Sequence, residues 1–335
     1  MFASIFGALE SGIIFAIMAL GVYLSFRVLD FPDLTVDGSF VTGAGTAAAM
    51  ITRGLDPILA TACGTLAGFI AGCFTGLLHT KGKIHALLSG ILMMIALWSI
   101  NLRIMEDAAN IPLLGKHTLM TEMADFAKIT GLDASLNAAL KAVGLGESLP
   151  RTWGILILML ALTLIIKMLN DWFLQTEIGL VLRATGDNKR MSRSFSANTD
   201  RLTILGLGLA NAWVALSGAI YAQYGGFADI GMGVGMIIVG LASVIIGEAL
   251  FGTKTIARTT LAVIGGAIIY RIVVTLALRI EFFKPGDLKL ITAVIVVLAL
   301  VVPKAVDNRR EKRRRKRRQA PADDRNREAE QRAAT

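Results

Sequence analysis

The chain has 335 residues, of which 54% are hydrophobic and 18% charged, with a net charge of +9 and a mean hydropathy of +0.63. Soluble domains carry about 25% charged residues, so this composition excludes an ordinary water-soluble globule and indicates a membrane protein. Residues 303–335 hold 13 Lys and Arg against 6 Asp and Glu and carry a net +7. The body retains only +2, which argues against a nucleic-acid-binding protein.

The cysteines and histidines offer neither a disulfide nor a metal site. Cys63 and Cys73 lie in one apolar stretch, about 15 Å apart along a helix, which is too far for an intrachain disulfide. The three histidines lack partners at the spacing of zinc ligands. We expect no metal and no other cofactor. Residues 1–26 carry Glu10 and lack a basic start and a cleavage site, which favours a retained first span over a signal peptide.

Nine apolar segments are long enough, or nearly so, to cross a bilayer core, which needs about 20 residues per helix. In chain order they are residues 6–26, 34–51, 57–78, 84–102, 153–174, 202–221, 236–251, 259–278 and 288–302. The second and seventh follow segments rich in Gly and Asp, and the last is short. The expected fold class is an all-α polytopic membrane protein with about nine transmembrane helices.

Lys and Arg in short loops mark the cytoplasmic side of a membrane protein. Counting spans back from the basic tail places residues 79–83 and 175–201, both basic, on the same side. Residues 103–152 then lie outside. This topology predicts an external N-terminus and a cytoplasmic C-terminus. We expect a permease domain over residues 1–302, followed by a basic, disordered cytoplasmic tail over residues 303–335.

The third span carries a stripe of glycines. Gly64, Gly68, Gly72 and Gly76 recur every four residues and so share one face of a helix. A face without side chains lets another backbone approach closely, as at many helix contacts in membranes. The stripe predicts that this span packs deep in the bundle.

Four spans precede residues 153–174 and four follow them. Each half contains, after its opening span, a short Asp/Gly segment before a Gly-rich helix, at residues 31–40 and 225–235. One intervening span places the halves in opposite orientations, so the pattern predicts two inverted four-helix repeats with interrupted helices. This arrangement is typical of transporters whose pathway lies between the repeats. The alternative is that membrane helices are simply rich in glycine.

Polar side chains at these interruptions can line a passage through the membrane. The candidates for the translocation pathway are Asp33, Asp37, Ser39, Tyr221, Gln223 and Asp229. Capping is the competing interpretation, because Asp37 can cap the helix that starts at Gly38, an interaction that contributes about 0.5 to 2 kcal/mol.

Charged residues within spans cost at least about 2.5 kcal/mol and persist only with a partner or a function. The main ones are Glu10, Asp37, Glu248 and Arg271. Arg271 can pair with Glu248, Asp37 or Glu10 to lock helices together, or it can contact solute. A second function class follows from the same residues, namely a standalone ion-coupled secondary transporter or channel that uses Glu10, Glu248 and Arg271.

The sequence offers no catalytic constellation. Residues 247–255 approach the phosphate-binding pattern Gly-x4-Gly-Lys-Ser/Thr, but Thr253 occupies the lysine position and the segment ends a membrane span. The histidines lie far in sequence from any activated serine signature. We expect a protein that is not an enzyme and does not itself hydrolyse ATP.

Residues 175–201 connect two spans on the basic side. Apolar residues at 178–184, a break at 186–188 and further residues at helical spacing up to 195 indicate short amphipathic helices. A soluble motor protein can bind such a helix and in this way move the helix bundle attached to it. The alternative is an ordinary solvated, positively charged loop.

Residues 178–195, Asn198-Thr199 and residues 216–226 resemble the membrane permeases of ABC importers of the branched-chain amino acid type. More narrowly, residues 30–40 together with residues 182–188 resemble the permeases paired with tryptophan/tyrosine-type substrate-binding lipoproteins.

The resemblance runs from about residue 6 to residue 302 and implies a role for the segment between the spans. In this family the segment is the coupling helix that docks into the ATPase, which implies coupling roles for Gly179, Arg183, Ala184, Gly186, Asp187 and Asn188. One departure is that Ser196-Ala197 stands where the family usually has Gly-Val.

The resemblance implies a permease subunit that moves a small solute, an amino acid and possibly an aromatic one, across the cytoplasmic (inner) membrane. Its implied partners are a cytoplasmic ABC ATPase subunit, a periplasmic or lipoprotein substrate-binding protein and a second copy of the chain. Residues 103–152 either dock the binding protein or cap the bundle. The tail, with nine basic residues among residues 309–318, either attracts anionic lipid or only fixes the topology.

Overall fold

The computed structural model describes residues 2–131, 153–278, 290, 293–294 and 297. The chain divides into a compact unit over Met1–Thr292 and a second unit over Ala293–Thr335. The description below concerns the first unit. The predicted span at 288–302 lies largely outside the described residues, and the tail at 303–335 lies wholly outside them.

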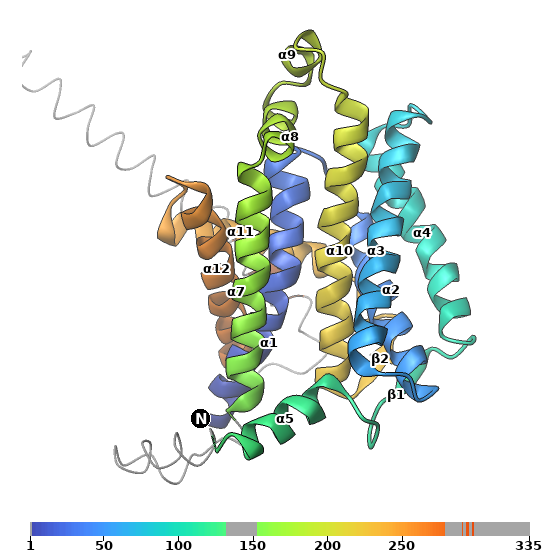
Figure 1. The fold of residues 1–335 in the computed structure, drawn as a ribbon, viewed down its shortest axis with the longest axis vertical. Coiled ribbons are helices and arrows are strands. Elements are labelled where there is room, and N and C mark those ends of the chain that lie inside the picture. The colour runs from blue at the N-terminus through green and yellow to red at the C-terminus, as the bar shows by residue number, and fades with distance from the viewer. Residues whose placement is uncertain (1, 132–152, 279–289, 291–292, 295–296, 298–335) are drawn as a thin grey trace, which may run out of the picture. The chain divides into compact units, whose positions relative to one another are not determined.

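Helices dominate the described part of the chain (Figure 1). In order, the elements are α1 (Phe2–Tyr23), the π-helical turn η1 (Leu24–Val28), α2 (Thr35–Thr52), α3 (Pro57–Thr80), α4 (Ala86–Ile104), β1 (Asn110–Pro112), α5 (Leu119–Ile129), α7 (Gly154–Gln175), α8 (Glu177–Asp187), α9 (Lys189–Ser194), α10 (Thr199–Gly225), β2 (Phe227–Asp229), α11 (Met236–Phe251) and α12 (Ile256–Ala277).

Six helices of the described chain are long and apolar enough to cross a membrane, namely Ser4–Val28, α3, α4, α7, α10 and α12. The shorter helices are α2, with 18 residues, and the apolar α11, with 16. The first eight predicted spans therefore all correspond to helices. An all-α polytopic membrane protein is confirmed, whereas the nine-helix inverted repeat stays a prediction.

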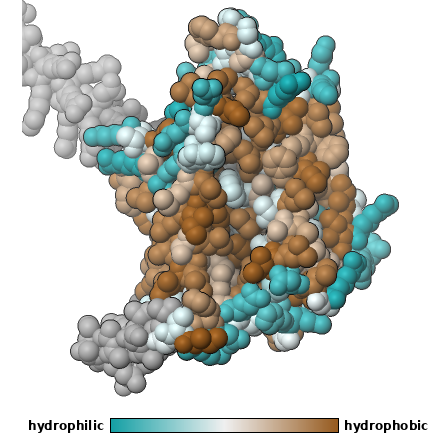
Figure 2. Space-filling view, viewed as in Figure 1, coloured by the Kyte–Doolittle hydropathy of each residue, from teal (hydrophilic) through white to brown (hydrophobic). Residues whose placement is uncertain are grey.

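The surface has the distribution of polarity that a bilayer requires. Figure 2 shows a broad apolar band across the middle of the viewed face, with hydrophilic residues gathered at both ends. Large apolar side chains are exposed on helices in the band, for example Leu66 on α3, Ile95 on α4 and Met168 on α7. Exposed aliphatic side chains over a belt of this kind are stable only in contact with lipid or another subunit.

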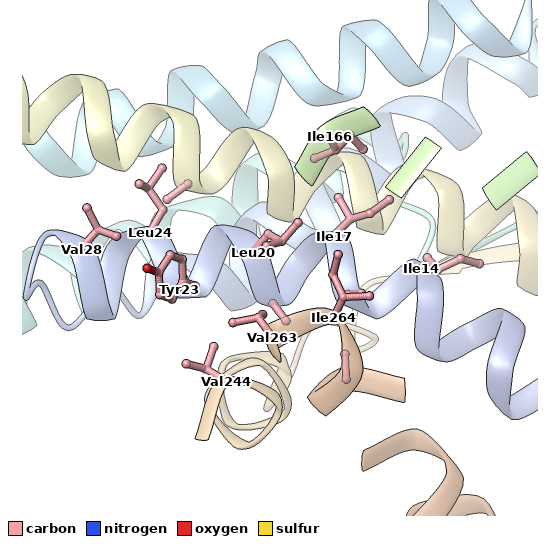
Figure 3. Close-up of a cluster of buried hydrophobic side chains, with 14 of the residues drawn as sticks. Ile14, Ile17, Leu20, Tyr23, Leu24, Val28, Ile166, Val244, Val263 and Ile264 are labelled. Carbon is pink, nitrogen blue, oxygen red and sulfur yellow. The ribbon is translucent and has the colours of Figure 1, made fainter. Parts of the chain in front are cut away.

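The core surrounds α1. Its span is 83% buried, and that of α10 is 72% buried, which makes these two helices the centre of the bundle. Figure 3 shows Ile14, Ile17 and Leu20 of α1 packed among side chains that include Ile166 of α7 and Val263 of α12. The largely apolar sequence of α1 is therefore explained by its contacts with α7, α10, α11 and α12.

The glycine stripe packs as predicted. A Cβ at Gly68 would lie 2.7 Å from the Asn211 carbonyl oxygen of α10, and one at Gly64 would lie 2.8 Å from the Gly43 carbonyl oxygen of α2. Gly72 and Gly76 approach the backbone of α10 in the same way. The stripe lets α3 lie against α2 and α10 at backbone distance.

Two groups of short elements occupy opposite ends of the bundle (Figure 1). One end carries α8 and α9. The other carries α5, the N-terminal end of α1 and a two-stranded antiparallel ribbon in which Asn110 of β1 lies opposite Asp229 of β2. No strand was expected from the sequence. Of the predicted external segment at 103–152, residues 132–152 lie outside the described chain.

Candidate functional site

The segment between α7 and α10 begins with a turn that requires glycine. The Thr176 hydroxyl accepts a hydrogen bond of 3.2 Å from the Gly179 N–H and so caps α8. A Cβ at Gly179 would overlap the Phe173 carbonyl oxygen and the backbone of Leu174, so the start of α8 lies directly against the end of α7.

The far end of α8 lies against the end of the first span. A Cβ at Gly186 would overlap the Val28 carbonyl oxygen, the last residue of η1. Leu182, one turn earlier, is fully buried in the same core cluster as α1. The absence of a side chain at Gly186 thus lets the backbones of α8 and η1 lie in direct contact.

The break that the sequence indicates at residues 186–188 is a helix boundary. The Asn188 side chain accepts a hydrogen bond of 3.0 Å from the Met191 N–H and caps α9, and the Asn198 side chain caps α10 with a bond of 3.1 Å from the Arg201 N–H. Asp187 and Asn188 are exposed. The Phe195 side chain, which follows α9, is 79% exposed.

The predicted coupling residues therefore lie on α8 and at the boundary between α8 and α9. Gly179, Arg183, Ala184, Gly186 and Asp187 lie on α8, and Asn188 starts α9. Arg183 and Ala184 are half-buried, and the Arg183 Nε makes no hydrogen bond within the described residues. A polar cavity of about 330 Å³, lined in part by Arg27, Asp30 and Arg183, separates α8 from η1 beside the Gly186 contact.

A charged contact links η1 to the second half of the chain. The Arg27 Nε donates to both carboxylate oxygens of Glu248 at 3.0 and 3.1 Å, and an Arg27 terminal nitrogen also pairs with Glu248. Glu248 lies near the end of α11. The end of the first span is therefore held by α8 on one side and α11 on another.

Asp37 has a partner that the sequence did not indicate. It lies inside the first turn of α2, and its carboxylate accepts hydrogen bonds of 2.8 Å from the Gly235 N–H and 2.8 Å from the Ile237 N–H. The expectation that it caps its own helix is wrong, because its oxygens point to the unpaired N–H groups at the start of α11. The two short helices thus meet at Asp37.

Asp33 is fully buried just before α2. One oxygen accepts from the Thr35 N–H at 3.0 Å, and the other accepts from the Asn211 side chain of α10 at 2.6 Å. Thr35 in turn shares a hydrogen bond of 2.8 Å with Thr75 of α3. The Ser39 hydroxyl is also fully buried and has no hydrogen-bond partner in the described chain.

The other three pathway candidates lie closer to the end that carries α5. Tyr221 packs against the ring of Phe15, with ring centroids 4.8 Å apart. The Gln223 side chain accepts a hydrogen bond of 2.9 Å from the Leu119 N–H of α5, and the Asp229 carboxylate accepts one of 2.8 Å from the Gly231 N–H. The structure therefore does not gather the six candidates into one cavity.

A second, mostly apolar cavity of about 460 Å³ lies beside the junction of the two short helices. Of the six pathway candidates, Asp37 alone lines it. The other polar residues at its wall, Ser99 and Asn101, come from α4. Asn101 offered a signal in the sequence, as a polar residue in an apolar span, whereas Trp98 beside it, which is 47% exposed, offered none.

The ion pairs expected for Arg271 do not form among the described residues. Its Nε donates to the Ser11 hydroxyl at 2.9 Å, and its guanidinium carbon lies 5.0 Å from the centroid of the Phe15 ring, a cation–π geometry. Glu10 instead accepts a hydrogen bond of 2.9 Å from the Tyr224 hydroxyl. Within the described chain Arg271 has no carboxylate partner because Arg27 binds Glu248, and the carboxylate of Asp37 binds the start of α11.

Comparisons with known proteins identify the family. A family model described as branched-chain amino acid transport system / permease component matches residues 4–302. The chain is 40% identical over 295 residues to the tyrosine transport system permease protein of Clostridioides difficile (strain R20291), across 88% of this chain and 90% of that protein.

More distant relatives extend the similarity. An uncharacterized protein of Rickettsia prowazekii (strain Madrid E) is 33% identical over 88% of this chain and 95% of its own length. The ribose import permease protein of Escherichia coli (strain K12) is 23% identical over 73% of this chain and 68% of its own length. No solved structure gives a significant match.

The family and the two relatives with a described function are transport permeases, and the third relative is uncharacterized. The family is a class of transporter and not a class of enzyme. The match covers every described span and the α8–α9 segment. The resemblance seen in the sequence is thus confirmed, and the chain belongs to the family of branched-chain amino acid transport system permeases.

Proposed function

We propose that the chain is the permease subunit of an ATP-binding cassette importer, which moves an amino acid, in particular an aromatic one, inward across the cytoplasmic membrane. A separate cytoplasmic ATPase subunit drives it, an external binding protein delivers the solute, and two copies of the chain form the pathway. The name of the tyrosine transport system permease at 40% identity supports the aromatic substrate.

The observation that carries the proposal is the α8–α9 segment. It is exposed at one end of the bundle, with Met191 and Phe195 presented among basic residues, yet Gly186 ties it to the backbone of η1. A soluble subunit can bind such a tip through its exposed aromatic and Arg side chains. Any displacement of the tip then reaches the first span without passing through a flexible linker.

A continuous set of contacts leads from this segment toward the membrane interior. Gly186 of α8 touches η1, Arg27 of η1 binds Glu248 of α11, and the start of α11 is capped by Asp37 of α2. Movement of α8 toward or away from the bundle would therefore shift α11 and α2 together. In this mechanism the two halves rock against each other and expose the passage alternately.

The proposed orientation follows from the same segment. If α8 and α9 face the cytoplasm, then α5, the β1–β2 ribbon and the start of α1 face outward, because they lie at the opposite end of the bundle. This orientation would place the N-terminal end of α1 outside the membrane. The outward end, with α5, is then the surface that meets the binding protein.

Substitution at Gly186 tests the coupling role. In the importer complex reconstituted into liposomes, Gly186→Ala inserts a methyl group against the Val28 carbonyl oxygen and is expected to lower ATP-driven uptake about tenfold, with basal ATPase activity retained. The matched control is Gly225→Ala, because a Cβ there meets no atom closer than 3.8 Å. Equal uptake by the two variants would contradict the coupling role.

A further inference from the structure

The cavity of about 460 Å³ lies where three separate parts of the fold meet. Its walls are the first turns of α2, the second half of α4, and the turn that leads into α11. Transporters with interrupted helices place solute at such junctions. The position, at the start of both short helices, therefore points to solute rather than to a packing defect.

The lining has the chemistry of a site for an apolar or aromatic group. Val41, Met94 and Val234 supply aliphatic surface, and Trp98, which is 47% exposed on the single chain, supplies an indole ring. Binding pockets for small molecules have volumes of about 300 to 1,000 Å³ and combine such surface with a few polar groups. An aromatic ring can stack on Trp98, a geometry that favours aromatic over aliphatic solutes.

The polar groups differ in whether they are already bonded. The Asn101 side chain donates a hydrogen bond of 3.1 Å to the Gly38 carbonyl oxygen and accepts one of 2.8 Å from the Thr42 hydroxyl. Its polar atoms are therefore already bonded within the protein. By contrast, Trp98 and Ser99 are both exposed on the single chain, so the indole N–H and the hydroxyl are accessible. These two groups remain available to a polar atom of a bound molecule.

Asp37 places negative charge at the cavity wall. It is half-buried, and each of its oxygens accepts one N–H from the start of α11. A carboxylate has about four acceptor positions, so it can accept a further donor without losing these bonds. An ammonium group is the donor that a carboxylate in a low-dielectric site favours most.

We propose that this cavity receives the transported solute within the permease, and that the solute is an amino acid with its aromatic side chain against Trp98 and its ammonium group at Asp37. The inference rests on the proposed import function and adds to it the site and the basis of selection. Trp98 is then the residue that determines specificity.

Uptake kinetics test the role of Trp98. In liposomes that hold the full importer complex, Trp98→Ala is expected to reduce L-tyrosine uptake at low concentration on the order of tenfold, and Trp98→Phe should retain most of it. L-Leucine uptake, where it occurs, should change by less than about twofold. The control is Trp172→Ala on α7, whose side chain is 68% exposed and lies outside the cavity.

Protection from labelling tests the site without turnover. In a complex with Cys63→Ala and Cys73→Ala, a cysteine introduced by Trp98→Cys is labelled with a maleimide in the absence of ATP. L-Tyrosine should slow this reaction, ribose should not, and neither should slow labelling of Trp172→Cys. Equal labelling with and without L-tyrosine at position 98, or equal uptake by Trp98→Ala and Trp172→Ala, would overturn the inference.

These outcomes separate the two proposals. ATP-driven uptake by the wild-type complex with no effect at Trp98 refutes the cavity and leaves the import function intact. Uptake that needs no ATP refutes the import function, while protection at position 98 still decides whether the cavity binds an aromatic amino acid. A cavity filled by lipid would give no protection and no change in uptake, and would also overturn the inference.

Discussion

Ser196 adopts a backbone conformation that suits glycine better than serine. It lies in the turn between α9 and α10 with a φ of 62°, in the left-handed region. The Cβ of an L-residue is crowded there, at a cost of about 1 to 2 kcal/mol. The resemblance described under Sequence analysis implies glycine at this position, and a left-handed φ is a physical reason for such a preference.

Replacement of this residue is predicted to stabilise the coupling segment. Ser196→Gly should raise the free energy of unfolding by about 1 kcal/mol, measured by thermal unfolding in detergent, and should leave uptake unchanged. Ser194→Gly is the matched control, since Ser194 lies inside α9 and glycine there costs roughly 0.5 kcal/mol. A destabilised Ser196→Gly variant would show that the left-handed turn is not under strain.

At the scale of elements, the sequence predicted helix positions well and helix contacts poorly. Runs of about 20 apolar residues are a local signal, so eight predicted spans correspond to helices. The cap that Asp37 provides for α11 joins residues about 200 positions apart, and nothing near Asp37 encodes it. The β1–β2 ribbon was missed because each strand has only three residues, too few to show a strand pattern in the sequence.

The cap at α11 gives a prediction with a natural control. Asp37→Ala and Asp56→Ala each remove a capping carboxylate, and each should cost about 1 kcal/mol of stability. Asp56 caps its own helix, α3, with bonds of 2.9 and 3.0 Å, whereas Asp37 joins α2 to α11. Uptake should therefore fall about tenfold for Asp37→Ala and remain near wild type for Asp56→Ala. Similar uptake by both variants would refute a role for the junction.

At the scale of the whole molecule, polarity and composition predicted the membrane class and the family motif predicted the segment that projects as α8 and α9. The candidate site was only partly foreseen. Five of the six coupling residues lie on α8 and the sixth, Asn188, follows it directly, but the six pathway candidates separate between residues 33–39 and the end that carries α5. Which polar residues share a cavity depends on how the short helices cross, and Trp98 carries no local signal of it.

The central claim is that ATP hydrolysis by a separate subunit drives solute movement through this chain. The most direct measurement is L-tyrosine uptake into liposomes that contain the permease with its ATPase and binding protein, compared with liposomes that contain the permease alone. We predict uptake that requires ATP and all three components. Uptake by the permease alone, driven by an ion gradient and abolished by substitution of Glu10 or Arg271, would contradict the claim and identify a standalone ion-coupled transporter.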